Sequence, residues 1–592
     1  MLLKSYPMRR VTRFQVEGWF LVASGVAVLA CGGLSPGCAD PGGVSSIVDT
    51  DAGELPPTTD GGDVPPTPSV QPPINITWDL HCDPLPQSMG VEERRVMFRR
   101  QLTNAAWLLD LVEPYGARIS FLAVGECYEF CVEESERDVC LPLLRRLEES
   151  GGILGTHAHA EYSQGPHDWA TVPNAYTSPA EADVRRAWEG SKGFTDEAVR
   201  QALGLADPEA LARVNTACES HLQLADATEL MEEHGYTIRE GGADQALARF
   251  FGHVPWNPYR PSGANPIAED LTTRFVTIPQ GMVIGQVGLH AGVWQDGSAA
   301  RKEAELLALY ATWIERARAG LPPKVWSFGW GVHTQDLDEG SPSRAAIEEL
   351  VPWLYEHFVT RTTADGNSIA RFASYVDVRD EYEAWEAASP GVSSFDYPTS
   401  SADYGLYPYL EHVNHYLRNA RLEEQIEAPA GVELYGLAAD GHPLLLAVSG
   451  GAAATVDASS LGVSTVRRVD VVTGETSEVS AASVGVGPHS AVLCAPDDCD
   501  AILGLETAPS MPDGGLPRPD GGLPRPDGGL PPRPDGGAPS CASSGMCPMG
   551  AVCCPAGLPC AGACVPDCRI DGGVPCPAAA PSCDLSTGLC RP

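Results

Sequence analysis

Residues 76–86, "ITWDLHCDPLP", carry the most informative pattern in the chain. Their β-branched and aromatic residues predict a strand. Asp79, His81 and Asp83 stand at alternate positions, and alternate side chains of a strand share one face. Charged groups aligned in this way are costly in an apolar core unless something compensates them. A bound cation would do so, and a solvated strand end ahead of Pro84 is the alternative.

A second stretch, "GGILGTHAHAEY" at residues 151–162, reads as a short apolar strand that ends at a histidine pair. His157 and His159 are two positions apart, so on an extended backbone both imidazoles project to one side. Neutral imidazole together with carboxylate suits zinc or a similar divalent ion. The alternative is that the pair forms the half-exposed polar end of a strand.

The region around these stretches alternates two kinds of pattern. Residues 92–112 and 141–150 have helical periodicity, and residues 118–125 read as a strand. Such alternation predicts βα units around a parallel sheet or barrel, a fold that places its sites at the carboxyl ends of strands. Farther along, short strands with Gly-rich turns predict a small all-β, sandwich-like domain, which we assign to residues 390–505.

Two further segments contain candidate site residues. In "KVWSFGWGVHTQDLD", residues 324–338, His333 follows a predicted strand. In "VPWNPYRPSG", residues 254–263, Arg260 lies between Tyr259 and Pro261. His290 also ends an apolar stretch and rivals His333 as a proton donor.

Composition limits the partners. At 592 residues the chain is too long for one hydrophobic core, so several domains are expected. It has 78 acidic against 39 basic residues, a formal net charge of -39, and no basic cluster stands out in its interior. Nucleic acid is therefore not an expected partner.

The N-terminus predicts export. Four basic residues precede an apolar run at residues 18–31 that is too short to span a bilayer, which is typical of a signal peptide over residues 1–31. "VLAC" at residues 28–31 resembles the bacterial lipobox, which would make Cys31 the lipidated residue. We therefore expect a membrane-anchored lipoprotein at the cell envelope or surface. A plain cleaved signal or a short anchor is the alternative.

Three other regions read as tethers or small modules. Residues 32–73 are rich in Pro, Gly, Thr and Asp, which predicts a disordered tether. Residues 506–540 contain repeats of Pro-Asp-Gly-Gly and predict a spacer. Residues 541–592 contain ten Cys and no His, which predicts a disulfide-rich module. Local disulfides are also expected among Cys82, Cys127, Cys131, Cys140 and Cys218.

The order of these motifs resembles that of the polysaccharide deacetylase family, the NodB-like de-N-acetylases. "TWDLHCDP" resembles the family's TFDDGP-like motif, "GTHAHAEY" its histidine motif, "YRPSG" its RPPYG-like motif and "WSFGWGVHTQDL" its late histidine strand. The resemblance covers residues 74–389, about half the chain. It implies a distorted (β/α)7 barrel that hydrolyses N-acetyl groups of a polysaccharide with one divalent metal ion, most often zinc.

The resemblance also implies roles for single residues. Asp79 would be the general base, Arg260 would orient it, and His333 would protonate the leaving amine. His157 and His159 would hold the metal. Leu80 stands where the family has a second Asp, so His81 or Asp83 would have to supply the missing ligand. The HxH spacing also departs from the family's usual HxxxH, and His167, in a long insertion over residues 163–222, is a reserve ligand.

Aromatic residues near the motifs suggest a sugar cleft. Trp78, Trp330 and Tyr259 are candidates because pyranose faces stack on aromatic rings, with a core position as the alternative. Two other functions stay open: a catalytically inactive glycan-binding surface lipoprotein, and a metal-dependent glycoside hydrolase on a similar barrel.

Overall fold

The computed structural model describes the central part of the chain with short gaps. The described ranges are 69–159, 161–174, 179–206, 216–218, 230–240, 256–261, 269–279, 283–290, 293–363, 365–394, 411–417, 419–503, 551–553, 564–566, 582–584 and 589–591. The predicted signal peptide with Cys31, the spacer and most of the Cys-rich module lie outside them and stay predictions. Within these ranges every helix is too short or too polar to cross a bilayer.

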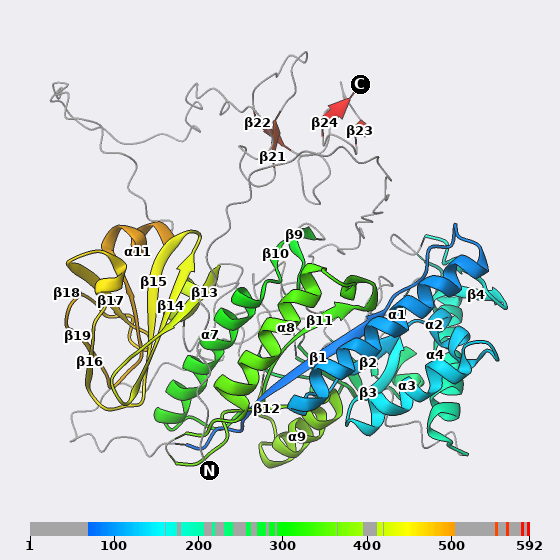
Figure 1. Cartoon of the computed structure of the whole chain (residues 1–592), viewed down its shortest axis with the longest axis horizontal. Helices are drawn as coiled ribbons and strands as arrows, with labels where there is room; N and C mark the ends of the chain where they lie inside the picture. Colours follow the sequence, from blue (N-terminus) through cyan, green and yellow to red (C-terminus); the bar gives the residue numbers. More distant parts are fainter. Residues whose placement is uncertain are drawn as a thin grey trace, which may run out of the picture.

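A parallel sheet forms the first part of the structure, with β1 (Ile74–Cys82) in its interior (Figure 1). The strand order is β11 (Trp326–His333), β1, β2 (Ser120–Ala123), β3 (Ile153–His157), β6 (Thr216–Cys218), β7 (Ile238–Glu240) and β8 (Val276–Ile278), and β12 (Ala370–Phe372) pairs with the start of β1. The predicted parallel sheet is confirmed. A closed barrel is not shown, because no ladder among the described residues joins β8 back to β11.

Helices cover this sheet. They are α1 (Val91–Val112), α2 (Gly125–Val132), α3 (Arg137–Glu149), α4 (Glu181–Leu203), α7 (Ala299–Arg318), α8 (Pro342–Leu354) and α9 (Tyr375–Ala388). The strand expected at residues 118–125 is shorter, because helix α2 already begins at Gly125. A hairpin of β4 (Glu161–Gly165) and β5 (Asp168–Thr171) follows β3, and β9 (Val287–His290) pairs with β10 (Val293–Asp296).

The alternation along β1 explains its mixed composition. Ile74, Ile76, Trp78, Leu80 and Cys82 are buried in the main hydrophobic cluster. The intervening polar residues form the other face. There the Asn75 amide donates a hydrogen bond of 2.7 Å to Glu381 of α9, and the Tyr375 hydroxyl donates one of 2.9 Å to Asp79. Asn75 and Asp79 of the polar face thus have hydrogen-bond partners on α9, which compensate their desolvation.

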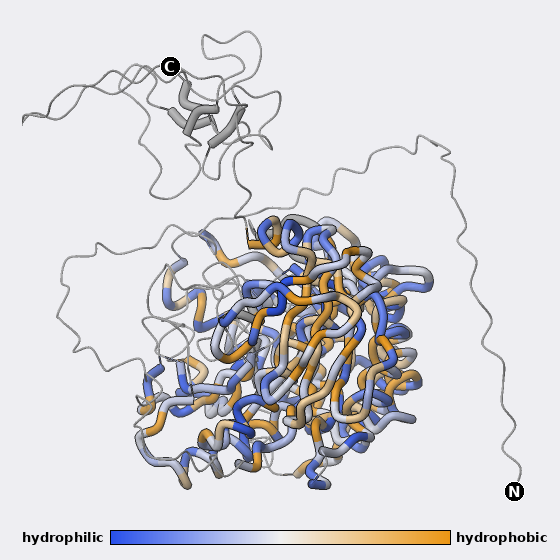
Figure 2. Tube along the Cα trace, turned by 90° about the vertical axis from the view of Figure 1, so that its left-hand side faces the viewer, coloured by the Kyte–Doolittle hydropathy of each residue, from blue (hydrophilic) through white to orange (hydrophobic). Residues whose placement is uncertain are grey.

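The second part of the structure is all-β, as predicted (Figure 1). Its antiparallel sheet has the order β13 (Ala420–Ile426), β14 (Val432–Ala439), β15 (His442–Ser449), β20 (Ala491–Cys494), β17 (Thr465–Asp470) and β18 (Thr476–Ser480). A second pair, β16 (Ala454–Val456) and β19 (Val484–Val486), packs across an apolar cluster that includes Leu434, Leu445, Val456 and Val484. Figure 2 shows these strands as hydrophobic segments between hydrophilic turns.

Helix α7 lies between the two parts, and buried polar contacts join them. Glu433 of β14 accepts hydrogen bonds from Arg361 (2.6 Å) and from the Tyr310 hydroxyl of α7 (2.9 Å). Glu315 of α7 accepts 2.6 and 2.8 Å bonds from the hydroxyl and backbone N–H of Ser490. Two short helices, α10 (Glu411–Leu417) and α11 (Pro496–Ile502), flank the all-β sheets, and Cys494 and Cys499 form a disulfide.

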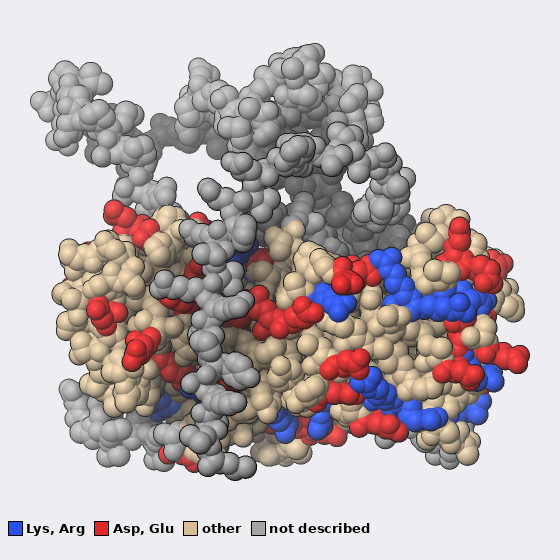
Figure 3. All heavy atoms as spheres, in the orientation of Figure 1, with Lys and Arg blue, Asp and Glu red and all other residues tan. Residues whose placement is uncertain are grey.

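Basic side chains gather over α1 on the face drawn in Figure 3, with acidic ones beside them. Arg95 pairs with Glu133 at 2.7 Å, and Arg99 pairs with Glu136 at 2.6 Å. The guanidinium groups of Arg95 and Arg99 are thus paired with carboxylates of the segment between α2 and α3.

Glu303 on α7 provides a stability test. Its side chain is buried, and burial, together with the charge of Glu349, raises its pKa from 4.5 to about 7. In the unfolded chain this carboxyl group ionises near its ordinary pKa. The folded state therefore becomes less stable relative to the unfolded chain as the pH rises from 4.5 through 7. Glu303→Gln should therefore raise the free energy of unfolding at pH 8 by about 1 to 3 kcal/mol and leave it nearly unchanged at pH 5. Urea denaturation at both pH values measures this.

The exposed Glu348 on α8 offers the control. Glu348→Gln should show no such difference between the two pH values. An equal effect of Glu303→Gln at pH 5 and pH 8 would contradict a raised pKa of Glu303 in the folded protein.

Candidate metal and acid–base site

The site lies where three parallel strands end. β1 and β11 are in register, so that His81 stands directly opposite His333, and β3 ends at His157. Because parallel strands bring their carboxyl ends to one edge of the sheet, these three imidazoles meet there. The ring of His81 stacks on that of His157 with centroids 4.3 Å apart and lies 5.6 Å from that of His333.

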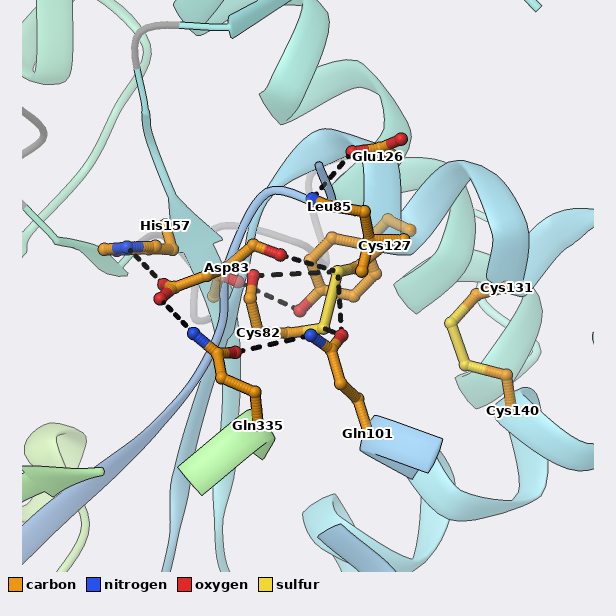
Figure 4. The surroundings of a disulfide bond; sticks show 12 residues. Cys82, Asp83, Leu85, Gln101, Glu126, Cys127, Cys131, Cys140, His157 and Gln335 are labelled. Carbon is orange, nitrogen blue, oxygen red and sulfur yellow. Dashed lines mark hydrogen bonds and ion pairs between the residues drawn. A yellow bond between two sulfur atoms is a disulfide. The ribbon is translucent and has the colours of Figure 1, made fainter. Parts of the chain in front are cut away.

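Three side chains form a group that can hold a metal ion. His81, Asp83 and His157 each offer a ligand atom, and these atoms lie within 4.8 Å of one another. The Nε2 atom of His157 is 3.3 Å from Oδ1 of Asp83, as Figure 4 shows. The other oxygen of Asp83 accepts a 2.7 Å hydrogen bond from the Gln335 amide. Two imidazoles and a carboxylate are a common ligand set for zinc.

The electrostatics of this group favour the protonation states that a metal requires. Burial acts to raise the pKa of Asp83, but His333, with His157 and His159, holds it well below its usual range. Burial lowers the pKa of His157 well below its usual range, and His81 adds to this effect. Ionised carboxylate and neutral imidazole are the metal-binding forms.

A buried polar atom gives a further sign of fit. Oδ1 of Asp83, the oxygen that faces Nε2 of His157, is buried and has no hydrogen-bond partner among the described residues. A buried carboxylate oxygen without a hydrogen bond is costly, and a divalent ion between Asp83 and the imidazoles would satisfy it. The residues present therefore fit a divalent ion.

Asp79 lies behind His81 and is not part of the ligand group. Its side chain is buried, its Oδ2 accepts the Tyr375 hydrogen bond, and the same oxygen is 3.4 Å from Nε2 of His81. A carboxylate that contacts a metal-ligating imidazole orients that ring. The structure thus favours a positioning role for Asp79 over that of general base. The sequence analysis missed Tyr375, which follows β12 and begins α9.

His333 forms a dyad with Asp336, three residues later. Its Nδ1 is 3.0 Å from Oδ2 of Asp336, and its Nε2 is 3.6 Å from Oδ2 of Asp83. Burial would lower the pKa of His333, but Asp83 and Asp336 outweigh it and raise the pKa to about 9. His333 therefore lies beside the ligand group as predicted, with an orienting carboxylate that its i+3 spacing could have indicated. The side chain of the rival, His290, is outside the described residues.

Two predicted metal ligands have other partners. Nδ1 of His159 is 3.5 Å from Glu161, and burial, which would lower the pKa of His159, is outweighed by the carboxylates of Glu161 and Asp83, which raise it. His159 touches His157 but is not a member of the ligand group. The reserve ligand His167 lies in the loop that joins β4 and β5, and its imidazole pairs with Glu133. His167 is not a member of the ligand group.

Four further predictions do not agree with the structure. Arg260 does not orient Asp79, because its guanidinium is bonded to Glu386 at 2.7 and 2.8 Å and to the carbonyls of Thr273 and Arg274. The three proposed sugar-stacking residues are core residues: Trp78, Trp330 and Tyr259 are 1%, 0% and 0% exposed. Trp78 and Trp330 pack on each other across β1 and β11, so neither ring is available to a polysaccharide.

Comparisons with known proteins add a distant likeness. No family model matches the chain, and no curated protein sequence is similar to it. Among solved structures, a putative polysaccharide deacetylase from Mycobacterium smegmatis aligns at 13% identity and a TM-score of 0.32, over 54% of this chain and 95% of that one. A probable polysaccharide deacetylase from Pseudomonas aeruginosa PAO1 aligns at 13% identity and a TM-score of 0.31, over 54% and 93%.

A glycoside hydrolase is also among the similar structures. A β-L-arabinopyranosidase from Geobacillus stearothermophilus aligns at 9% identity and a TM-score of 0.20, over 72% of this chain and 97% of that one. TM-scores of this size do not distinguish between the two activities, so the geometry of the site has to do so.

The ligand group predicts different effects for the two neighbouring histidines. His157→Ala removes a ligand atom and should weaken Zn²⁺ binding by about 100-fold or more, whereas His159→Ala should weaken it by less than about tenfold. Competition with a chromophoric chelator measures the Zn²⁺ dissociation constant of each variant. Equal losses in the two variants would show that His159 is a ligand together with His157.

The dyad predicts a change in the titration of His333. Asp336→Asn removes the negative charge 3.0 Å from Nδ1, which stabilises the imidazolium, so the pKa of His333 in metal-free protein should fall from about 9. NMR titration of ¹⁵N-labelled histidine follows this pKa. An unchanged value would mean that Asp336 does not hold the ring.

Proposed function

We propose that this protein is a metal-dependent hydrolase that removes N-acetyl groups from a polysaccharide. The observation that carries the proposal is that the His81–Asp83–His157 group and the His333–Asp336 dyad lie next to each other at one edge of the sheet. Hydrolysis of an amide needs an electrophile for the carbonyl oxygen and a proton donor for the amine, and this edge can provide both.

His81, Asp83 and His157 would hold the ion, and we propose zinc on the basis of the nitrogen and oxygen ligands. When bound, a divalent ion supplies Lewis acidity to a carbonyl oxygen and lowers the pKa of a water. Asp79 and Tyr375 keep the His81 ring in place, and Gln335 fixes one oxygen of Asp83. Contacts and hydrogen bonds from these neighbouring side chains would thus hold the ligands in position for the ion.

His333 would transfer protons. Its Nδ1 is held by Asp336, which leaves Nε2 facing Asp83 and the ligand group. Nε2 is therefore the atom that can hold or deliver a proton next to a substrate carbonyl, and delivery to the leaving nitrogen completes the cleavage of an amide.

An amide substrate agrees better with the site than a glycosidic one. Glycosidases generally use two carboxylates on either side of the scissile bond. Near His333 the described carboxylates Asp83 and Asp336 both contact imidazoles of the site, which suits metal binding and ring orientation. The motif order of residues 74–389 also supports deacetylation. Export and anchoring through Cys31 complete the proposal and would place the enzyme at the cell envelope.

Acetate release tests this function. The purified protein loaded with Zn²⁺ should release acetate from N-acetylated chitooligosaccharide or peptidoglycan fragments, and a chelator should stop the release. His333→Gln should lower kcat by about 100-fold or more while the zinc content stays at the wild-type level.

Other products would contradict the proposal. New reducing ends without acetate would indicate a glycoside hydrolase. Glycan binding that is unchanged by chelator and without turnover would indicate a binding protein.

A further inference from the structure

The ligand Asp83 lies outside the strand that presents His81. β1 ends at Cys82, and Asp83 belongs to the connection that leads to Leu85 and on to α1. The β-ladder therefore fixes His81 and leaves Asp83 to other restraints. A metal ligand on a loop has to be held by its surroundings if the site is to be preorganised.

Three contacts join the residues before and after Asp83 to the start of α2, and Figure 4 shows the disulfide and the Leu85–Glu126 hydrogen bond among them. The sulfur of Cys82 is bonded to Cys127. The carbonyl of Cys82 accepts a 3.0 Å hydrogen bond from the N–H of Val124, and the N–H of Leu85 donates one of 3.1 Å to Glu126. The residues before and after Asp83 are thus both tied to the first turn of one helix.

The disulfide is the one covalent restraint among these contacts. Strand alternation sends His81 to the side of the site and Cys82 to the opposite side, toward Cys127 of α2. Cys82 and Cys127 are each 1% exposed, and 45 positions separate them in sequence. A link across so long a loop removes many conformations from the segment that carries the ligand.

We propose that the Cys82–Cys127 disulfide is a positioning element of the metal site, which holds the Asp83 carboxylate where it meets His81 and His157. This inference rests on the proposed metal-dependent function and deepens it. Without the link, metal binding has to include the free energy of ordering residues 83–85, so affinity falls although no ligand is lost.

A neighbouring disulfide provides a matched control. Cys131 and Cys140 join α2 to α3, and they are buried to a similar degree, at 2% and 0% exposure. Neither residue belongs to the ligand group, and Figure 4 shows this disulfide apart from His157 and Asp83. Its loss tests the general effect of removing a buried disulfide from α2.

The experiment compares two double variants of the full chain. Cys82→Ala/Cys127→Ala should raise the Zn²⁺ dissociation constant by about 10- to 100-fold and change the visible absorption bands of bound Co²⁺, because the Asp83 ligand is no longer fixed. Cys131→Ala/Cys140→Ala should keep the Zn²⁺ dissociation constant within about twofold of wild type and leave the Co²⁺ bands unchanged, even where it lowers the melting temperature. If the first variant does not fold, Cys82→Val/Cys127→Ala retains more of the buried volume and is measured in its place.

The outcomes separate this inference from the proposed function. Wild-type affinity and an unchanged Co²⁺ spectrum in the Cys82 variant would overturn the inference and leave the proposed function intact. Equal weakening in both double variants would also overturn it, since the effect would then be one of general stability. A wild-type protein that binds no metal would overturn the proposed function as well.

Discussion

The parallel register of β1 with its neighbours is the constraint on which the site depends. The ladder pairs His81 with His333 on one side and Leu80 with Phe121 on the other, so the three strands end at a common edge. A shift of one residue along β1 would turn His81 into the hydrophobic cluster and bring Leu80 to the polar face. The apolar face of β1, from Ile74 to Cys82, makes such a shift costly, and core packing thereby fixes the position of His81.

The surroundings of the candidate ligand group favour the charge states in which its members could bind a cation. Asp83 is ionised because imidazoles surround it, and His157 is neutral because it is buried next to His81. The contacting groups then fix each ligand by a different means. Asp79 and Tyr375 act on His81, while Gln335 and the Cys82 disulfide restrain the segment of Asp83.

Local patterns in the sequence predicted much of this arrangement. The alternation of Asp79, His81 and Asp83 and the position of His157 at a strand end were read from the two-residue period of a strand. The structure brings His81, Asp83 and His157 together, with Asp79 behind His81. The helix at residues 92–112 and the all-β part followed from periodicity in the same way. The pairs Cys82–Cys127 and Cys131–Cys140 agree with the expected local disulfides.

Contacts between distant segments were not predictable from these patterns. Arg260 pairs with Glu386, 126 positions away, and Asp79 pairs with Tyr375, 296 positions away. No spacing rule relates such residues. The tryptophans were misassigned because a ring that can stack on a sugar also fills a core well, and only packing shows that Trp78 and Trp330 contact each other.

Anomalous X-ray diffraction at the zinc absorption edge tests the central claim most directly. Crystals of the Zn²⁺-loaded protein should show one strong peak within bonding distance of His81, Asp83 and His157. A peak elsewhere, or no peak at full loading, would contradict the claim that these three side chains form a metal site.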